Sequence, residues 1–299
     1  MNHKHRIVGI CRHALVVVAA LIVPLAVASP ALAVEHHPKG DFANFADCPL
    51  ITPELNSCVF AQATSGEFTI GKKTVPINKT ITLQGGFTVN PETGVLGFVG
   101  AEDGNTLSKT ALYVPGGLFG IEAPKSWPTE AKEKFNKMIN EGLTGVTATT
   151  ELAAPASSIS LNTENLIDAK GTALSLPVKV KLSNTFLGSN CYIGSNSSPI
   201  VINFTTGTTS PPEPNKPITG KVGTLEFKDE FTLIRISNNS LVNNSFAAPG
   251  ATGCGGSFSS FVDPLVNTLL GLPSAAGHNT AILNGTLETA AAEAVKASE

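Results

Sequence analysis

The sequence predicts a mainly β fold, an antiparallel β-sandwich with two short accessory helices. The 299-residue chain has only 14% charged residues, and it is rich in Thr, Asn, Ser, Gly and Val, which suit strands and turns. Many short runs of alternating apolar and polar residues lie between turn residues. Helical spacing of apolar residues is confined to two segments, 126–143 and 260–270.

Residues 1–33 have the pattern of a signal peptide. Lys4, Arg6 and Arg12 form a basic start, an apolar stretch runs from Ala14 to Ala28, and Ala-Leu-Ala at 31–33 suits signal peptidase. The stretch contains Pro24 and is short for a bilayer span, which needs about 20 residues. We therefore expect export and cleavage before Val34 rather than a retained anchor.

The first β region is predicted over residues 34–125, with strands from Phe60 onward. GEFTIGKKTVPI predicts two short strands around a Gly-Lys turn, and KTITLQGGFTV predicts a third. GVLGFVG and TALYVPGGLFGI continue the pattern. Asp103-Gly104-Asn105 between them predicts a hairpin turn rather than a calcium loop, because the other ligands of such a loop are missing.

A connecting helix is predicted over residues 126–143. Ser126 is the candidate N-cap, Pro128 suits the first turn, and Gly142 ends the helix. An apolar stripe including Phe135 and Met138 falls on one face. We expect this face to pack on a sheet or between two β regions rather than on a membrane, because it is narrow and the polar face is mixed in charge.

The second β region is predicted over residues 144–299. GVTATTELA, LSLPVKVKLSNTF, PIVINFTTGTT and GTLEFKDEFTLIRIS predict strands, and SPPEPNKP predicts a rigid extended loop. In the second strand Lys179 and Lys181 alternate with apolar residues, so we expect both lysines to face solvent rather than form a ligand platform.

A helix at 260–270 and an alanine-rich tail complete this region. The helix carries its apolar residues on one side and ends at Gly271 and Pro273; these apolar residues are Val262, Leu265, Val266, Leu269 and Leu270. NTAILNGTLE predicts an extended segment, and we expect the tail, TAAAEAVKASE, to fray.

Four cysteines remain after cleavage, and an even number in an exported chain predicts disulfides. We expect Cys48 to pair with Cys58 across a short loop. Cys191 and Cys254 lie in similar sequence contexts, each after Asn-(Thr/Ser)-Phe and a turn-rich spacer, and we expect them to pair as well. A zinc site would need Cys-x-x-Cys pairs or interleaved histidines, and a nucleophilic Cys254 would leave an unpaired thiol. We therefore predict no metal ligands.

Charge and histidine content limit the function classes. Loss of Lys4, Arg6 and Arg12 takes the formal net charge from −3 to −6 and leaves Arg235 as the sole arginine. Nucleic-acid binding relies on Lys and Arg clusters, so no nucleic-acid partner is expected.

Residues suited to catalysis are few. His36 and His37 fall at the new, mobile N-terminus, which leaves His278 as the candidate base, although a loop histidine is more often solvated. Glu226, Asp229 and Glu230 lie too close in sequence to face each other across a glycosidase cleft. Hydrolase elbows and phosphate-binding glycine loops are absent from the sequence. We predict no catalytic residues and no cofactor.

Four segments resemble exported actinobacterial proteins that carry no assigned activity. These segments are GDFANFADCPL, GEFTIGKKTVPINKTITLQGGF, TTGTTSPPEPNKPITG and GLPSAAGHNTAILNGTLE. The resemblance spans most of the chain after residue 33, implies export from a Gram-positive host, and assigns no functional residue.

The sequence therefore favours a noncatalytic secreted or noncovalently envelope-associated β-protein. Its role would be to bind or structure an unknown cell-surface or envelope component, with no transmembrane span after cleavage. Two alternatives remain, a secreted hydrolase with a site near His278 and an envelope pore or lipid-associated protein.

Overall fold

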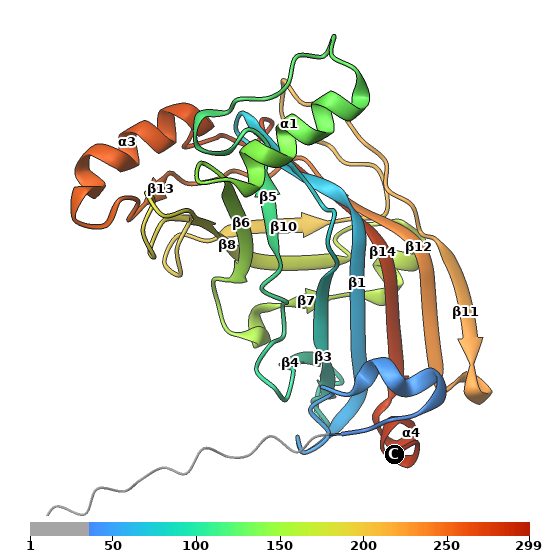
Figure 1. The fold of residues 1–299 in the computed structure, drawn as a ribbon. Helices are drawn as coiled ribbons and strands as arrows, with labels where there is room; N and C mark the ends of the chain where they lie inside the picture. Colours follow the sequence, from blue (N-terminus) through green and yellow to red (C-terminus); the bar gives the residue numbers. More distant parts are fainter. Residues whose placement is uncertain (1–35) are drawn as a thin grey trace, which may run out of the picture. The chain divides into compact units, whose positions relative to one another are not determined.

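The computed structural model describes residues 36–299, and the predicted signal peptide lies outside them. The fold is mainly β, with 38% strand and 21% helix, and its strands form two antiparallel sheets. This confirms the predicted β-sandwich. In Figure 1, β8 (Leu174–Ser183) and β10 (Ile200–Phe204) of one sheet run across the direction of β1 (Leu55–Ile70) of the other.

Sheet A has the strand order β11-β12-β14-β1-β3-β4, with β2 also paired to β1. The long strand β1 and the C-terminal strand β14 (Thr280–Ala291) are paired from Ser57↔Ala291 to Thr69↔Thr280. The remaining strands of sheet A are β2 (Lys73–Pro76), β3 (Ile81–Val89), β4 (Leu96–Gly100), β11 (Thr224–Lys228) and β12 (Leu233–Asn243).

Sheet B has the order β13-β9-β8-β6-β5, with β7 and β10 also paired to β8. Its centre is β8, whose predicted alternation is confirmed because Leu174, Leu176, Val178, Val180 and Leu182 are all buried. The remaining strands are β5 (Ala111–Val114), β6 (Val146–Leu152), β7 (Ser160–Leu161), β9 (Tyr192–Ile193) and β13 (Ala251–Thr252). Segments 34–125 and 144–299 each supply strands to both sheets.

The structure corrects two predictions about connections and ends. Asp103-Gly104-Asn105 does form a turn, in which Asn105 N–H donates to Asp103 Oδ1 at 2.7 Å. However, β4 and β5 on either side belong to different sheets, so this is no hairpin. The alanine-rich tail is ordered as the end of β14 and α4 (Ala292–Ala297), because pairing with β1 and burial of Val295 hold it.

The two predicted helices are present as α1 (Thr129–Glu141) and α3 (Ser259–Leu270), and both lie at the upper end in Figure 1. A short helix, α2 (Thr163–Asp168), and five 3-10 turns were not predicted. Ser126 is not the N-cap of α1, since the capping position is Pro128. No residue of α1 is fully buried, but Ala131, Phe135 and Ile139 of the predicted apolar face are half-buried, and α1 contacts β5 of sheet B. Met138 of the same predicted face is exposed.

The main core lies between the two sheets, and a smaller cluster lies at the opposite end of sheet A from α1 and α3. This second cluster joins the 3-10 turn η1 (Gly40–Phe45) and α4 to the start of β1; its buried members are Phe45, Cys48, Cys58, Leu233, Ala290, Ala292 and Val295. Both chain ends of the described domain are therefore anchored.

Candidate functional site

Two adjoining cavities lie between the sheets. The larger has a volume of about 70 Å³ and is lined by residues of strands including β1, β8, β10 and β12. The second, of about 60 Å³, lies nearer the β1–β2 hairpin. Phe68, Thr150, Val178 and Ile202 line both cavities and separate them. Apart from Thr150, this shared wall is apolar.

Such voids are costly if they stay empty. Protein interiors normally leave few voids larger than a water molecule, and unfilled cavity volume costs about 24 cal/mol per Å³. Two cavities of about 70 and 60 Å³ would then cost about 3 kcal/mol together. An apolar ligand would recover that free energy, whereas water would not, because water needs polar partners.

Lys73 lies at one end of the smaller cavity. Its side chain lines the cavity together with Ile70 and Leu270, while its ammonium donates to Pro115 O at 3.3 Å and lies 3.8 Å from a Glu122 carboxylate oxygen. A lysine placed in this way packs its aliphatic stem against apolar surface and keeps its charge near solvent. It could pair with the anionic end of a bound chain.

The β1–β2 hairpin closes against the end of α3. Lys72 N–H donates to Leu270 O at 2.8 Å, and Gly71 N–H donates to the side chain of Asn279 at 2.9 Å. Gly71 has φ +58°, and a Cβ at this position would lie 2.2 Å from Leu270 O. Only glycine lets the hairpin approach α3 this closely, so the cavity wall includes the last residue of α3.

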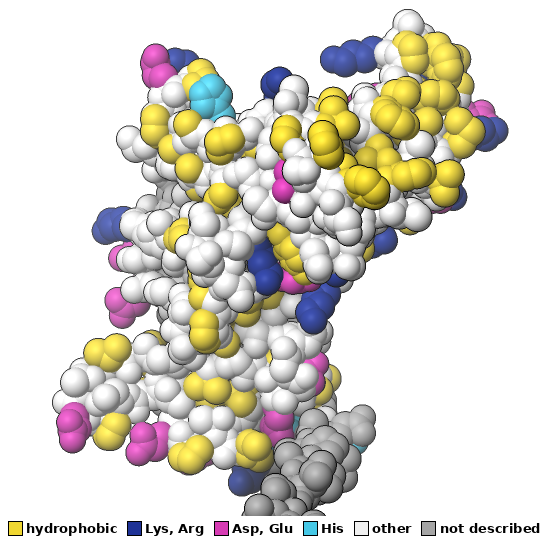
Figure 2. All heavy atoms as spheres, turned by 90° about the vertical axis from the view of Figure 1, so that its left-hand side faces the viewer, with side chains coloured by type: hydrophobic (Ala, Val, Ile, Leu, Met, Phe, Trp, Pro, Cys, Tyr) yellow, Lys and Arg dark blue, Asp and Glu magenta, His cyan; other side chains and the backbone are white. Residues whose placement is uncertain are grey.

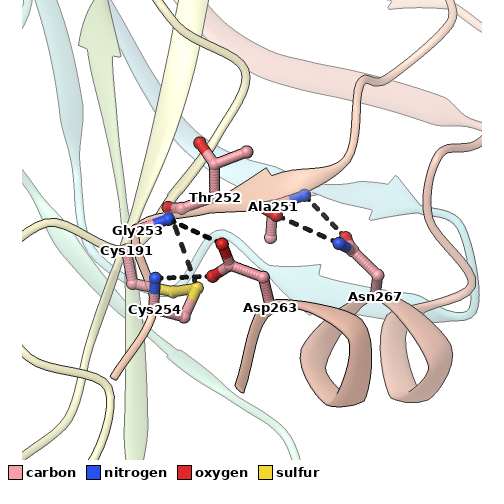
Figure 3. The surroundings of a disulfide bond; sticks show 7 residues. All are labelled: Cys191, Ala251, Thr252, Gly253, Cys254, Asp263 and Asn267. Carbon is pink, nitrogen blue, oxygen red and sulfur yellow. Dashed lines mark hydrogen bonds between the residues drawn. A yellow bond between two sulfur atoms is a disulfide. The ribbon is translucent and has the colours of Figure 1, made fainter. Parts of the chain in front are cut away.

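Cys254 is half of a disulfide. The bonds Cys48–Cys58 and Cys191–Cys254 are both present, as predicted. Figure 3 shows the second bond beside Asp263 of α3, whose carboxylate accepts from Cys254 N–H at 2.7 Å and Gly253 N–H at 3.1 Å. Gly253 has φ +75°, and a Cβ there would lie 2.2 Å from Asn190 O. The glycines around Cys254 therefore serve the turn that brings the two cysteines together.

The residues considered as catalytic candidates in the sequence do not come together as a catalytic site in residues 36–299. His278 is exposed, and its backbone N–H donates to Ala275 O at 3.2 Å. Glu226, Asp229 and Glu230 are also exposed.

His36 differs from the prediction, because its side chain is only 10% exposed. Its Nε2 lies 3.2 Å from Glu102, and its Nδ1 contacts Glu299, so it is held rather than mobile. No group of metal-ligating side chains occurs within the described residues.

A polar cluster covers part of the outer face of sheet B. The hydroxyl of Tyr192 donates to Glu151 at 3.4 Å, and the ammonium groups of Lys179 and Lys181 lie 5.0 and 5.9 Å from its ring centroid. Burial, followed by the charge of Glu151 and its hydrogen bond, raises the pKa of Tyr192 above its ordinary value. Both lysines are half-buried and pack over one aromatic ring.

Comparisons of the chain with models of known families, with curated proteins and with solved structures found no match.

Sequence reasoning identified the cysteines and missed the cavities. Alternation in β8 showed which side chains face inward, but the space left between two crossing sheets depends on how they pack. Of the apolar residues expected on one side of α3, Val266 is buried, Val262 and Leu270 are half-buried against the core, and Leu265 and Leu269 are exposed. The polar residues Asp263 and Asn267 were the sequence signal for the side of α3 that faces the domain, because both bond to neighbouring backbone.

Proposed function

We propose that the chain is a noncatalytic exported protein that works at the cell surface by binding an apolar chain between its two sheets. The observation that carries this proposal is the pair of adjoining apolar cavities separated by Phe68, Thr150, Val178 and Ile202. Their joint size is close to that of engineered cavities that take up benzene. The ligand class is a hydrocarbon chain end, with an anionic group at Lys73.

Export and extracellular action are supported by the two disulfides, which persist in oxidising compartments. In residues 36–299 no helix has the length and apolar character needed to cross a bilayer. The lack of an assembled set of base, nucleophile and orienting group in the same residues supports a binding role over the hydrolase alternative.

The test uses variants that fill the cavities. Ala61 lines the larger cavity and Ala148 the smaller one. Ala61→Val and Ala148→Val should each stabilise the free protein by about 1 kcal/mol and weaken binding of octanoate and octanol. Ala111→Val is the matched control, since Ala111 lies in β5 and lines neither cavity. Binding is measured as the ligand-dependent rise in melting temperature.

Lys73→Met separates the contribution of the ligand's anionic group to binding from that of its hydrocarbon chain. This variant should weaken binding of octanoate and leave binding of octanol unchanged. If neither probe raises the melting temperature of the wild-type protein, the proposal is wrong. It is also wrong if the two cavity-filling variants behave like Ala111→Val.

A further inference from the structure

The helix α3 packs on the domain through one side and exposes a second apolar stripe on the opposite side. The inward side contains the apolar Val262, Val266 and Leu270 beside the polar Asp263 and Asn267. Asn267 donates to Ala251 O at 3.0 Å and accepts from Ala251 N–H at 2.6 Å, and Asp263 accepts from the backbone around the disulfide (Figure 3). The opposite stripe has helical spacing and is 46–78% exposed; it consists of Phe258, Phe261, Leu265 and Leu269. An ordinary surface helix has one apolar stripe, which faces the core. The helix α3 has such a stripe and carries the exposed one in addition.

The stripe continues onto neighbouring segments. Asn184 donates to Leu143 O at 3.0 Å and Gly145 O at 2.7 Å, and Gly255 N–H donates to Leu187 O at 2.7 Å. The loop 184–188 thus joins the end of α1 to the start of α3, and its Phe186 is exposed. Phe119, Ile121, Trp127, Met138 and Leu143 are exposed on and around α1. Figure 2 shows hydrophobic side chains gathered at the upper right, at the end of the domain that carries these helices.

Charge around this surface favours one occupant. Asp263 is the only charged residue in the sequence between Arg235 and Glu288. Its carboxylate is turned inward, where it accepts from Cys254 N–H. Lys72 lies beside Gly271 at the end of α3, and Lys125 and Lys132 flank the apolar residues near α1. Within residues 36–299, these three lysines make no ion pair. Of the acidic residues around α1, Glu122, Glu130 and Glu141 each pair with another lysine, and the exposed Glu133 lies on α1 next to Lys132.

We propose that this surface, defined as Phe258, Phe261, Leu265, Leu269 and Phe186 with the exposed apolar residues around α1, docks on the surface of an anionic lipid bilayer. Phe and Leu side chains are those that enter the headgroup boundary, to a depth of about 5–10 Å, when a helix lies in the interface. The helix α3 carries no Lys or Arg of its own, so Lys72, Lys125 and Lys132 on the neighbouring segments would meet the anionic headgroups. Trp127 suits the same depth. The sequence-based expectation against membrane contact considered α1 alone, and the structure adds α3 to it.

The docked orientation would place the smaller cavity next to the bilayer. Leu270 lines that cavity and directly follows the exposed Leu269. An acyl chain leaving the membrane would therefore meet the cavity wall formed by Leu270, Ile70 and Lys73. Bilayer docking does not depend on the cavity ligand, so the two proposals can be tested apart.

The experiment measures partition of the chain 34–299 onto phosphatidylcholine–phosphatidylglycerol vesicles by co-sedimentation. We expect the wild type to bind and the double variant Phe258→Ser/Phe261→Ser to bind at least about tenfold more weakly. Phe231→Ser is the matched control, because Phe231 is 77% exposed, like Phe261 at 78%, but lies in the β11–β12 turn. The control should bind like the wild type.

Three results would overturn the proposal. They are no binding of the wild type to the vesicles, equal weakening in Phe231→Ser, and a wild-type dimer in solution that the double variant converts to a monomer. The last result would make the stripe an interface between copies of this chain. The double variant should still be stabilised by octanol, and Ala61→Val and Ala148→Val should still bind vesicles, so failure of one proposal is distinguishable from failure of the other.

Discussion

Arg235 of β12 lies directly opposite Glu288 of β14, and its Nε donates to the Glu288 carboxylate. The Glu288 side chain is only 4% exposed and also accepts from Asn44 at 2.9 Å. Arg235 in turn lies 3.7 Å from Asp41 of η1. The only arginine after residue 33 thus ties the N-terminal segment to the centre of sheet A.

Removing the arginine alone should destabilise the fold strongly. Arg235→Met leaves a buried carboxylate without its cation, which costs about 3–5 kcal/mol of unfolding free energy. The double variant Arg235→Met/Glu288→Gln should recover most of that loss, because Gln is neutral and still accepts from Asn44. Urea unfolding measures both. A single variant as stable as the wild type would contradict this account of the pair.

The two disulfides should contribute different amounts to the free energy of unfolding. The bond Cys191–Cys254 joins residues 63 apart and Cys48–Cys58 joins residues 10 apart, so the loop-entropy model gives about 4 and about 3 kcal/mol. Replacing each pair by alanines and measuring unfolding in urea checks the order. Alkylation of the unreduced protein should label none of these four cysteines, and labelling of Cys254 would refute the pairing.

The local features of this fold were predictable, and the long-range ones were not. The Gly71-Lys72 turn and the strands on either side follow from residues within a few positions of each other. The alanine-rich tail was predicted to fray because the last residues of a chain are poorly ordered unless other elements hold them. It is ordered because β14 has β1 on one side and β12 on the other, and no local pattern reveals such partners.

The candidate surfaces show a similar limit. The spacing of Phe261, Leu265 and Leu269 predicts an apolar side for α3, but it does not say whether that side faces the protein. The inward side of α3 combines Val262, Val266 and Leu270, which pack on the core, with Asp263 and Asn267, which bond to backbone at 251–254 outside the helix. The cavities depend on the packing of side chains from two sheets, which no single strand pattern specifies.

Stability at high pH should depend on Tyr192. Burial, then the charge and hydrogen bond of Glu151, raise its pKa in the folded protein. The pKa of Tyr192 is therefore higher in the folded protein than its value of about 10 in the unfolded chain. Its contribution to the free energy of unfolding is complete at pH below the unfolded-state pKa, and it is lost as pH rises through the folded-state pKa. In Tyr113→Phe, the tyrosinate absorbance should therefore titrate above pH of about 10. Adding Glu151→Gln should lower the midpoint; an unchanged midpoint would exclude Glu151 as a cause.

Export should remove residues 1–33, which lie outside the described residues. The Ala-Leu-Ala sequence at 31–33 suits signal peptidase, so the secreted protein should begin at Val34. N-terminal sequencing of protein from the culture medium checks this. Recovery of the protein only in the membrane fraction, with the apolar segment 14–28 still attached, would favour a retained anchor instead.

The packing of α3 on the domain predicts which of its side chains contribute to stability. Asp263 satisfies two backbone N–H groups beside the disulfide, so Asp263→Ala leaves both without their acceptor and should cost about 2 kcal/mol. Phe261 is 78% exposed, so Phe261→Ser should change the unfolding free energy by no more than about 0.5 kcal/mol. If the stripe that contains Phe261 faced the core, the order would be the reverse. Urea unfolding gives the two values, and hydrogen exchange should show faster exchange in α3 and at 251–254 for Asp263→Ala alone. If Phe261→Ser proves the more damaging change, α3 packs its aromatic side inward and the docking surface loses its basis.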